Sequence, residues 1–213
     1  MDVDLGVPNM NLVTYITQKL YHRNPHRQIH VVGKNNIVSY IPTGLFIHIY
    51  GEHNSINIDP SVQSFYGNIS IGDINTPVNN CTVKIGKKCS CNGVNIVLYE
   101  NDSSVQIGEG CMFSYGIEIW ASDSHSIIDQ KTKQLLNLGK EIFIGNHVWV
   151  GMRTTILKNS HISNDCIIGA GAIVAGKFTE EHCVIAGNPA KIVKRGISWD
   201  GLRPCEYQMK HKF

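Results

Sequence analysis

Residues 144–179 read IGNHVWVGMRTTILKNSHISNDCIIGAGAIVAGKFT, and this stretch decides the fold. An aliphatic residue recurs at every sixth position without a slip, at Ile144, Val150, Ile156, Ile162, Ile168 and Val174. The position two residues before the next aliphatic is mostly small, at Val148, Thr154, Ser160, Cys166, Ala172 and Phe178. A helix needs apolar spacings of three and four, and a plain strand needs a spacing of two. A strict spacing of six therefore predicts neither.

A repeat of six is typical of a coil in which each hexapeptide supplies one short strand and one turn. The aliphatic side chain points to the axis, three hexapeptides complete one coil, and successive coils stack at about 4.8 Å. One coil cannot bury its own face, so several must stack to form a continuous core. The sequence therefore predicts an all-β fold, a parallel β-helix.

The same rhythm extends upstream with decreasing regularity. Residues 107–195 form its regular part, because Ile107, Phe113 and Ile119 keep the spacing of six. Residues 29–106 hold short alternating stretches that Asn and Gly punctuate. Such stretches are typical of strands and turns, so we expect irregular coils of the β-helix there.

The two ends of the chain lack the hexapeptide rhythm. Residues 1–28 form an N-terminal segment in which a short helix is predicted over residues 9–23. Its apolar residues are four positions apart, at Leu12, Ile16 and Leu20. Residues 196–213 form a C-terminal tail without a clear period.

The rhythm is interrupted once, between Ile119 and Ile142, and then resumes in phase. A repeat architecture tolerates an insertion only as a loop that leaves the coil. Residues from about 120 to 141 are therefore predicted to form a protruding loop. Long loops on rigid scaffolds often carry function, and this one contains SDSHSIID at residues 122–129, with His125.

Composition excludes several classes of protein. Charged residues make up 17% of the chain and the net charge is +2, which argues against a nucleic-acid-binding surface and against disorder. The seven cysteines are scattered without a C-x-x-C pair. Residues 1–8 lack the basic start and apolar stretch of a signal peptide, and no window resembles a membrane span. We expect a cytoplasmic protein with reduced thiols and no membrane span.

Three stretches within residues 107–195 together resemble the hexapeptide-repeat O-acetyltransferases. They are His125 followed by IGNHVWVG at 144–151, IGAGAIV at 168–174, and VIAGNPAKIV at 184–193. The resemblance is strongest to bacterial capsule and lipopolysaccharide polysaccharide O-acetyltransferases and to maltose/galactoside acetyltransferases. It implies a left-handed parallel β-helix, whereas physical rules alone favour right-handed crossovers.

The same resemblance implies an activity and an assembly. The expected reaction is acetyl transfer from acetyl-CoA to a sugar hydroxyl of a bacterial surface polysaccharide or its precursor. The expected assembly is a homotrimer with active sites between subunits, a carbohydrate acceptor, and no required metal.

The resemblance also implies roles for single residues. An alcohol is a poor nucleophile, and the imidazole of His125 matches the family's general base, although any loop can carry a solvated histidine. Asn95 matches an asparagine that orients this histidine, and Asp123 and Glu118 are alternatives for that role. The purely structural alternative is that Asn95 serves only as a residue of a turn. Trp149 matches a residue in the wall of the family's active site. The purely structural alternative is that its ring packs under the loop.

Small and cationic residues are the candidates for binding acetyl-CoA. Small residues let backbone amides approach the pantetheine arm, although glycine is also common at the corners of such a coil. Lysine and arginine are the usual partners of phosphates, although the cationic group could be a solvated tail. The candidates are Gly151, Ala170, Gly171, Lys177, Lys191 and Arg195, beside Lys194.

Three other functions compete with this interpretation. An N-acetyltransferase acting on a nucleotide-linked amino sugar usually carries an extra nucleotide-binding domain, and residues 1–80 contain no Gly-rich phosphate loop. A non-catalytic β-helix used for assembly has no need of the His125 loop and the closing motif. A zinc lyase of the γ-carbonic anhydrase kind needs three suitably spaced histidines, so we expect no metal at His147 or His161.

Overall fold

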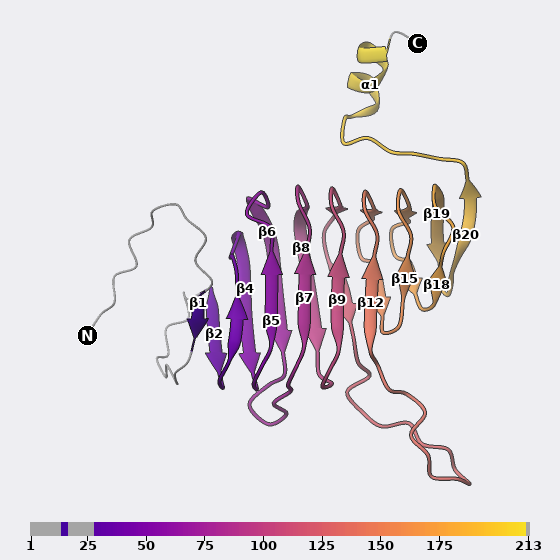
Figure 1. Ribbon diagram of the computed structural model, residues 1–213. Coiled ribbons are helices and arrows are strands. Elements are labelled where there is room, and N and C mark those ends of the chain that lie inside the picture. Colours follow the sequence, from indigo (N-terminus) through magenta and orange to yellow (C-terminus); the bar gives the residue numbers. More distant parts are fainter. Residues whose placement is uncertain (1–13, 17–27, 212–213) are drawn as a thin grey trace.

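Stacked strands build a parallel β-helix whose axis runs from the N-terminal to the C-terminal coils (Figure 1). The structure is a computed structural model that describes residues 14–16 and 28–211. Its strands belong to two sheets, one of eight strands and one of twelve. Each coil contributes to both sheets, so residues far apart in sequence become neighbours along the axis.

The eight-stranded sheet is one flat side of the helix, here called face 1. Neighbouring strands in it are parallel, except that β1 pairs antiparallel with β3. In spatial order its strands are β1 (Thr14–Ile16), β3 (Asn36–Val38), β5 (Ser55–Ile58), β7 (Thr82–Ile85), β9 (Ser104–Ile107), β12 (Glu141–Ile144), β15 (His161–Ile162) and β18 (Lys177–Phe178).

The twelve-stranded sheet forms the other two sides. Its N-terminal strands are β2 (Ile29–Val32), β4 (Thr43–Tyr50), β6 (Ser64–Ile71) and β8 (Ser90–Leu98). Face 2 consists of β10 (Met112–Phe113), β13 (Trp149–Val150), β16 (Ile167–Ile168) and β19 (Cys183–Gly187), followed by the antiparallel β20 (Ala190–Arg195). Face 3 consists of β11 (Ile117–Trp120), β14 (Thr155–Leu157) and β17 (Ile173–Val174).

β8 is the strand at which faces 2 and 3 separate. Its first residues pair with β10, and Val94 to Val97 pair with β11. The preceding strands β4 and β6 run through this corner, each with a register shift near the bend. A long strand that turns a corner needs no separate hexapeptide for each side, which explains why residues 29–106 lack the strict rhythm.

The core consists of columns of aliphatic side chains. The register places Ile119 beside Ile156 and Ile156 beside Val174, and all three are fully buried. All six aliphatic positions predicted from the spacing of six are buried at 0% exposure. Full burial of such a side chain contributes about 1.5–3 kcal/mol. The hexapeptide prediction of the core is therefore confirmed.

The two ends of the chain differ from the sequence-based expectation. The helix predicted over residues 9–23 is wrong for Thr14–Ile16, which form β1, while the rest of that range lies outside the described residues. Threonine, tyrosine and isoleucine favour strands, and β3 in the first coil offers an open sheet edge. In the tail, α1 (Pro204–His211) buries none of its residues, so it left no apolar period to detect. No helix among the described residues has the length and apolarity needed to cross a membrane.

Candidate active site

Residues 121–140 leave the coil between β11 and β12 as the predicted protruding loop (Figure 1). A single antiparallel bridge joins Ile128 to Leu135 within it. At its tip, the Asp129 carboxylate accepts hydrogen bonds from the backbone amides of Lys131 and Thr132, at 2.9 and 2.6 Å. The loop is thus a short ordered hairpin.

The two neighbouring coils hold the stem of the loop. From the preceding coil, Glu100 Oε2 accepts the Gly139 amide at 2.7 Å. From the following coil, the Asn159 side chain accepts the Lys140 amide at 3.1 Å and donates to the Leu138 carbonyl at 3.3 Å. Gly139 passes so close to Ala121 that a Cβ atom would lie 2.1 Å from the Ala121 carbonyl oxygen. Only glycine fits this crossing.

His125 is exposed in the first part of the loop, between its stem and its tip. Its carbonyl oxygen accepts a hydrogen bond from Asn137 Nδ2 at 2.8 Å. Within the described part of this chain its ring has no hydrogen-bond partner. The structure therefore fixes the backbone of His125 and presents its ring to the outside.

Asn95 lies on the outer surface of face 3 and contacts Glu118. The register pairs Asn95 with Glu118, and Asn95 Nδ2 donates to Glu118 Oε2 at 3.0 Å. The indole N–H of Trp120 donates to the same oxygen at 2.9 Å. In a single chain Asn95 therefore orients a carboxylate and makes no hydrogen bond to His125, so its expected role stays a prediction.

Trp149 lies on the outer surface of face 2 in an aromatic group that sequence analysis missed in part. Its ring is 6.2 Å from the Trp199 ring, and Trp199 stacks on His147 at 4.2 Å. The Trp199 indole N–H donates to the His147 carbonyl at 2.8 Å, and His147 Nδ1 lies 2.8 Å from Asp165 Oδ1. Trp199 comes from the tail, where no period or motif points to it. Trp149 remains 38% exposed and available to a ligand.

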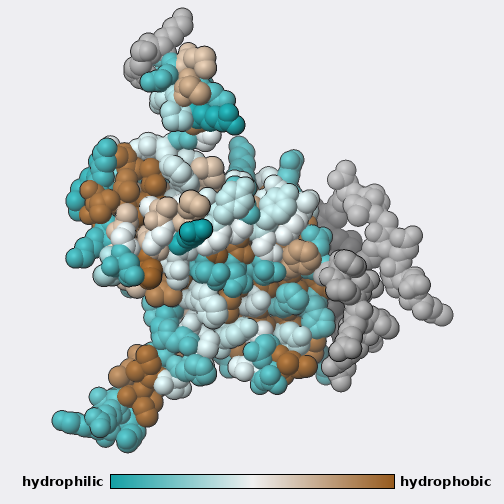
Figure 2. Space-filling view, turned by 180° about the vertical axis from the view of Figure 1, so that it is seen from behind, coloured by the Kyte–Doolittle hydropathy of each residue, from teal (hydrophilic) through white to brown (hydrophobic). Residues whose placement is uncertain are grey.

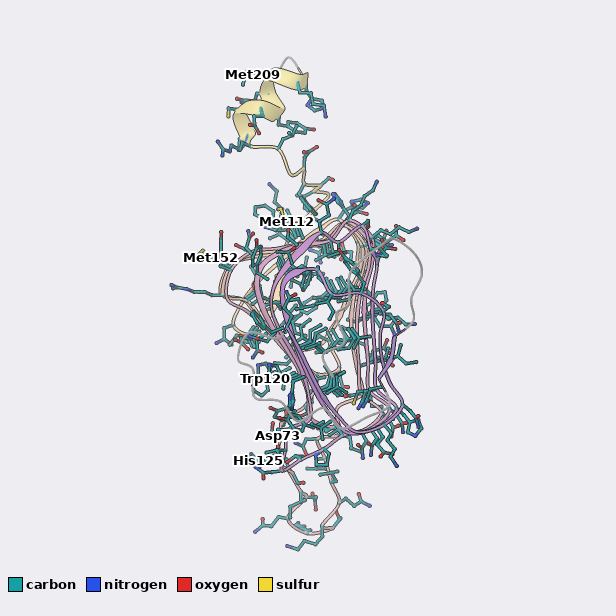
Figure 3. All side chains as sticks on the ribbon, turned by 90° about the vertical axis from the view of Figure 1, so that its left-hand side faces the viewer. Asp73, Met112, Trp120, His125, Met152 and Met209 are labelled. Carbon is teal, nitrogen blue, oxygen red and sulfur yellow. The ribbon has the colours of Figure 1, made fainter. Side chains whose placement is uncertain are left out.

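One chain keeps His125 and Trp149 apart. Figure 3 looks along the axis and shows Met112 near one end of the cross-section and His125 beyond the other. Met112 is the direct strand neighbour of Trp149. A site that uses both side chains needs two copies of the chain.

The small residues expected to contact acetyl-CoA lie at or near the corner between faces 2 and 3. A Cβ atom on Gly151 would meet the Ala170 amide and the Ile168 carbonyl at 2.7 Å, so packing of adjacent coils already explains this glycine. Gly171 has a positive φ of 70° in an exposed turn, and Ala170 is exposed beside it. Both turn residues are accessible to a ligand at this corner.

The expected cationic residues are divided between the two sheets. Lys177 lies on β18 of face 1, whereas Lys191 and Arg195 lie on β20. Arg195 Nε donates to both carboxylate oxygens of Glu180, at 2.8 and 3.1 Å. All three cations are exposed, but the charge of Arg195 already has a partner within the chain.

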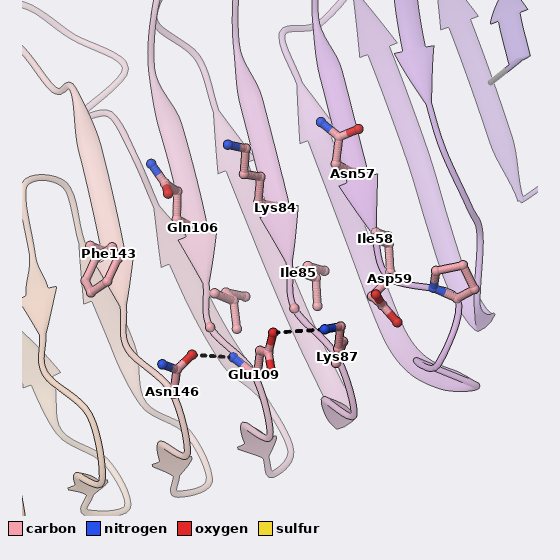
Figure 4. A pocket seen from close by; sticks show the side chains of 14 residues that line it. Asn57, Ile58, Asp59, Lys84, Ile85, Lys87, Gln106, Glu109, Phe143 and Asn146 are labelled. Atoms are coloured by element: carbon pink, nitrogen blue, oxygen red, sulfur yellow. Dashed lines mark hydrogen bonds and ion pairs between the residues drawn. The ribbon is translucent and has the colours of Figure 1, made fainter. Parts of the chain in front are cut away.

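A groove of about 500 Å³ crosses the outer surface of face 1 (Figure 4). Its lining includes Lys84, Gln106 and Phe143, and an ion pair of 3.6 Å joins Lys87 to Glu109. None of the predicted site residues lines this groove. The candidate site is therefore assigned to the loop and to the outer surfaces of faces 2 and 3.

Known proteins match this chain in sequence. The family model described as bacterial transferase hexapeptide (six repeats) matches residues 141–176. The polysialic acid O-acetyltransferase of Neisseria meningitidis is 32% identical over 187 residues, which cover 78% of this chain and 86% of that protein. The polysialic acid O-acetyltransferase of Escherichia coli O1:K1 / APEC is 37% identical over 128 residues, which cover 60% of this chain and 41% of that protein.

The fold matches a solved relative as well. The crystal structure of the polySia specific acetyltransferase NeuO has a TM-score of 0.68 and 27% identity, over 86% of this chain and 92% of that one. The left-handed coiling of the β-helix, which the family resemblance implies, is confirmed by this structural similarity. The chain belongs to the hexapeptide-repeat O-acetyltransferases, acyltransferases built on a left-handed parallel β-helix.

Proposed function

We propose that this protein transfers acetyl from acetyl-CoA to a hydroxyl group of an anionic bacterial capsule polysaccharide of the polysialic acid kind, or of its precursor. The acceptor is inferred from the two similar polysialic acid O-acetyltransferases, one of which matches over 86% of its length. The observation that carries the proposal is the ordered loop, which presents His125 at the edge of the β-helix in a member of this family.

In this mechanism His125 acts as the general base. Its ring nitrogen takes the proton of the acceptor hydroxyl while the hydroxyl oxygen attacks the thioester carbonyl carbon. The C–S bond then breaks, and the proton passes from His125 to the departing sulfur of CoA. Trp149 supplies an aromatic wall for the thioester or the sugar, because its ring is exposed on the outer surface of face 2.

The working enzyme is a homotrimer in which His125 of one subunit meets Trp149 of its neighbour. The separation of the two residues in one chain supports this arrangement (Figure 3). A second observation is a row of exposed apolar side chains along the edge between faces 2 and 3. Tyr66, Tyr115 and Met152 are 47, 61 and 45% exposed there. Such an edge favours burial against other copies around a three-fold axis.

The loop itself carries apolar side chains that suit a contact between subunits. Figure 2 shows them on the projecting loop at the lower left of that view. Five are between 46 and 62% exposed: Ile127, Ile128, Leu135, Leu136 and Leu138. In the trimer this surface packs on the adjacent subunit and brings His125 to face 2.

The reaction is assigned to the cytoplasm. All seven cysteines are free thiols, and six of them are buried. Free thiols in this number are typical of a reducing compartment.

The proposal is tested with acetyl-CoA and polysialic acid as substrates. His125→Ala should lower kcat by about 10²–10⁴-fold while the trimer mass and acetyl-CoA affinity stay unchanged. His48→Ala, which removes an exposed histidine from β4, serves as the control and should leave kcat unchanged. Near-full turnover by His125→Ala would refute the role of His125. Failure of the purified protein to bind acetyl-CoA in calorimetry would refute the activity.

A further inference from the structure

We propose that Asp123, Asn137 and Lys158 form a clamp that positions His125, and that the rate of acetyl transfer depends on it. The three residues are positioning residues, because none of them needs to touch the reacting atoms. The proposal rests on the proposed function, since it takes His125 as the base.

Asn137 is the centre of the clamp. Its side-chain amide donates to the carbonyl oxygen of His125 at 2.8 Å and accepts the amide of Ile127 at 2.8 Å. It also donates to Asp123 Oδ2 at 2.8 Å. An asparagine amide offers two N–H donors and one oxygen acceptor, so these bonds use both donors and the acceptor. One side chain thus holds the Asp123 carboxylate before His125 and the backbone at His125 and after it.

Lys158 ties this arrangement to the rigid coil. It follows β14 directly, and the pairing of Trp120 with Leu157 places it beside the first residue of the loop. Its ammonium donates to Asp123 Oδ2 at 2.6 Å and to the Asn137 carbonyl oxygen. Its side chain is only 15% exposed, so its ammonium is largely shielded from solvent. The loop therefore takes its position from the next coil of the core.

The charge of Asp123 strengthens the clamp. Hydrogen bonds from Lys158 and then from Asn137 hold the pKa of Asp123 below its ordinary value. Asp123 is therefore a carboxylate at neutral pH, and both bonds to it are charge-assisted.

The backbone beside His125 is held in an uncommon conformation. Ser124 has a positive φ of 62°, and its amide donates to Ser122 Oγ at 3.1 Å. A non-glycine residue keeps such a conformation only when its surroundings determine it. The clamp brackets this turn through Asp123 and His125, so it fixes the direction in which the His125 ring leaves the loop.

Closure of the loop alone does not account for these bonds. Glu100 and Asn159 already hold the stem at Gly139, Leu138 and Lys140. The tip has its own bridge and its own Asp129 cap. The clamp engages the segment between them, residues 123–127, which contains His125. This selective placement indicates a role in positioning the base.

The test compares kcat and KM of clamp variants with matched controls. Asn137→Ala and Lys158→Met should lower kcat about 10- to 100-fold, because misplacing a catalytic group by about 1 Å costs that much. KM for acetyl-CoA should stay unchanged. The pH–rate profile should keep its shape along the pH axis, and only its maximal rate should fall. Asp123→Asn keeps an oxygen that accepts from both donors but removes the charge, so its kcat should fall less than that of Asn137→Ala and Lys158→Met. Lys158→Arg should recover most of the loss seen in Lys158→Met.

Two further variants serve as controls on the same loop. Gln134→Ala and Lys131→Met remove side chains outside the clamp and should leave kcat unchanged. Amide exchange followed by mass spectrometry should show faster exchange of residues 122–128 in Asn137→Ala and Lys158→Met than in the controls. This readout does not depend on turnover.

The outcomes separate the two proposals. Wild-type kcat in Asn137→Ala and Lys158→Met, with His125→Ala inactive, would overturn the clamp and leave the proposed function intact. Faster exchange without loss of kcat would overturn the clamp as well. An active His125→Ala would overturn the proposed function itself.

Discussion

Gly139→Ala should lower kcat strongly and lower the melting temperature only modestly. The new Cβ would lie 2.1 Å from the Ala121 carbonyl oxygen, whereas ordinary contacts begin at 3.4 Å, so the two strands of the stem must separate by about 1.3 Å. Overpacking of this kind costs about 1–3 kcal/mol. Ala121 and Gly139 are both buried, so the stem must deform to relieve the clash, and a cost of this size should lower Tm by several degrees.

The loss of activity should be larger, because the stem carries the segment that holds His125. A displacement of about 1 Å lowers the rate about 10²-fold, so we expect kcat to fall about 10- to 100-fold. Gly201→Ala is the matched control, since a Cβ atom there meets nothing within 4 Å. Steady-state kinetics and thermal unfolding of both variants measure the two effects. A Gly139→Ala enzyme with kcat within threefold of wild type would refute this reasoning.

Two further predictions concern the core. Ile119→Ala should lower the free energy of unfolding by about 2–5 kcal/mol in urea, because Ile119 is fully buried between Ile96 and Ile156. Replacing the 68% exposed Ile74 with alanine should cost less than about 0.5 kcal/mol; equal losses in the two variants would contradict the stacking. In the folded protein a thiol reagent should modify Cys205 alone, because the other six thiols are buried and burial raises the pKa of Cys91 to about 12. All seven should react after denaturation, and fast reaction of several thiols in the folded protein would contradict the burial.

The regular half of the fold could be predicted because its period is local. Each hexapeptide places its own aliphatic residue in the core, so the spacing from Ile144 to Val174 sufficed to predict six fully buried positions. The N-terminal half resisted the same reasoning, since β4, β6 and β8 turn the corner as continuous strands. The strand at Thr14–Ile16 depends on the open edge of β3, which a local helical spacing cannot reveal.

The loop could be predicted from the interrupted rhythm, but its fixation could not. Asp123 bonds to Lys158, 35 residues away, and to Asn137, 14 residues away. These partners follow from which coil lies beside which, and the length of the loop hides that relation in the sequence. The same holds for Asn95, because the strand register places Glu118 opposite it, 23 residues later. Trp199 reaches His147 from a tail without any period.

Mixing two inactive variants tests the central claim most directly, namely that each site joins His125 of one subunit to Trp149 of the next. His125→Ala and Trp149→Ala proteins are denatured together in equal amounts, refolded into mixed trimers and assayed for acetyl transfer. A site is intact only when its loop comes from a Trp149→Ala subunit and its face 2 from a His125→Ala subunit, so about one quarter of wild-type activity should return. If both residues act within the same chain, every site in every mixed trimer carries a lesion. Activity no higher than that of the separate variants would contradict the account.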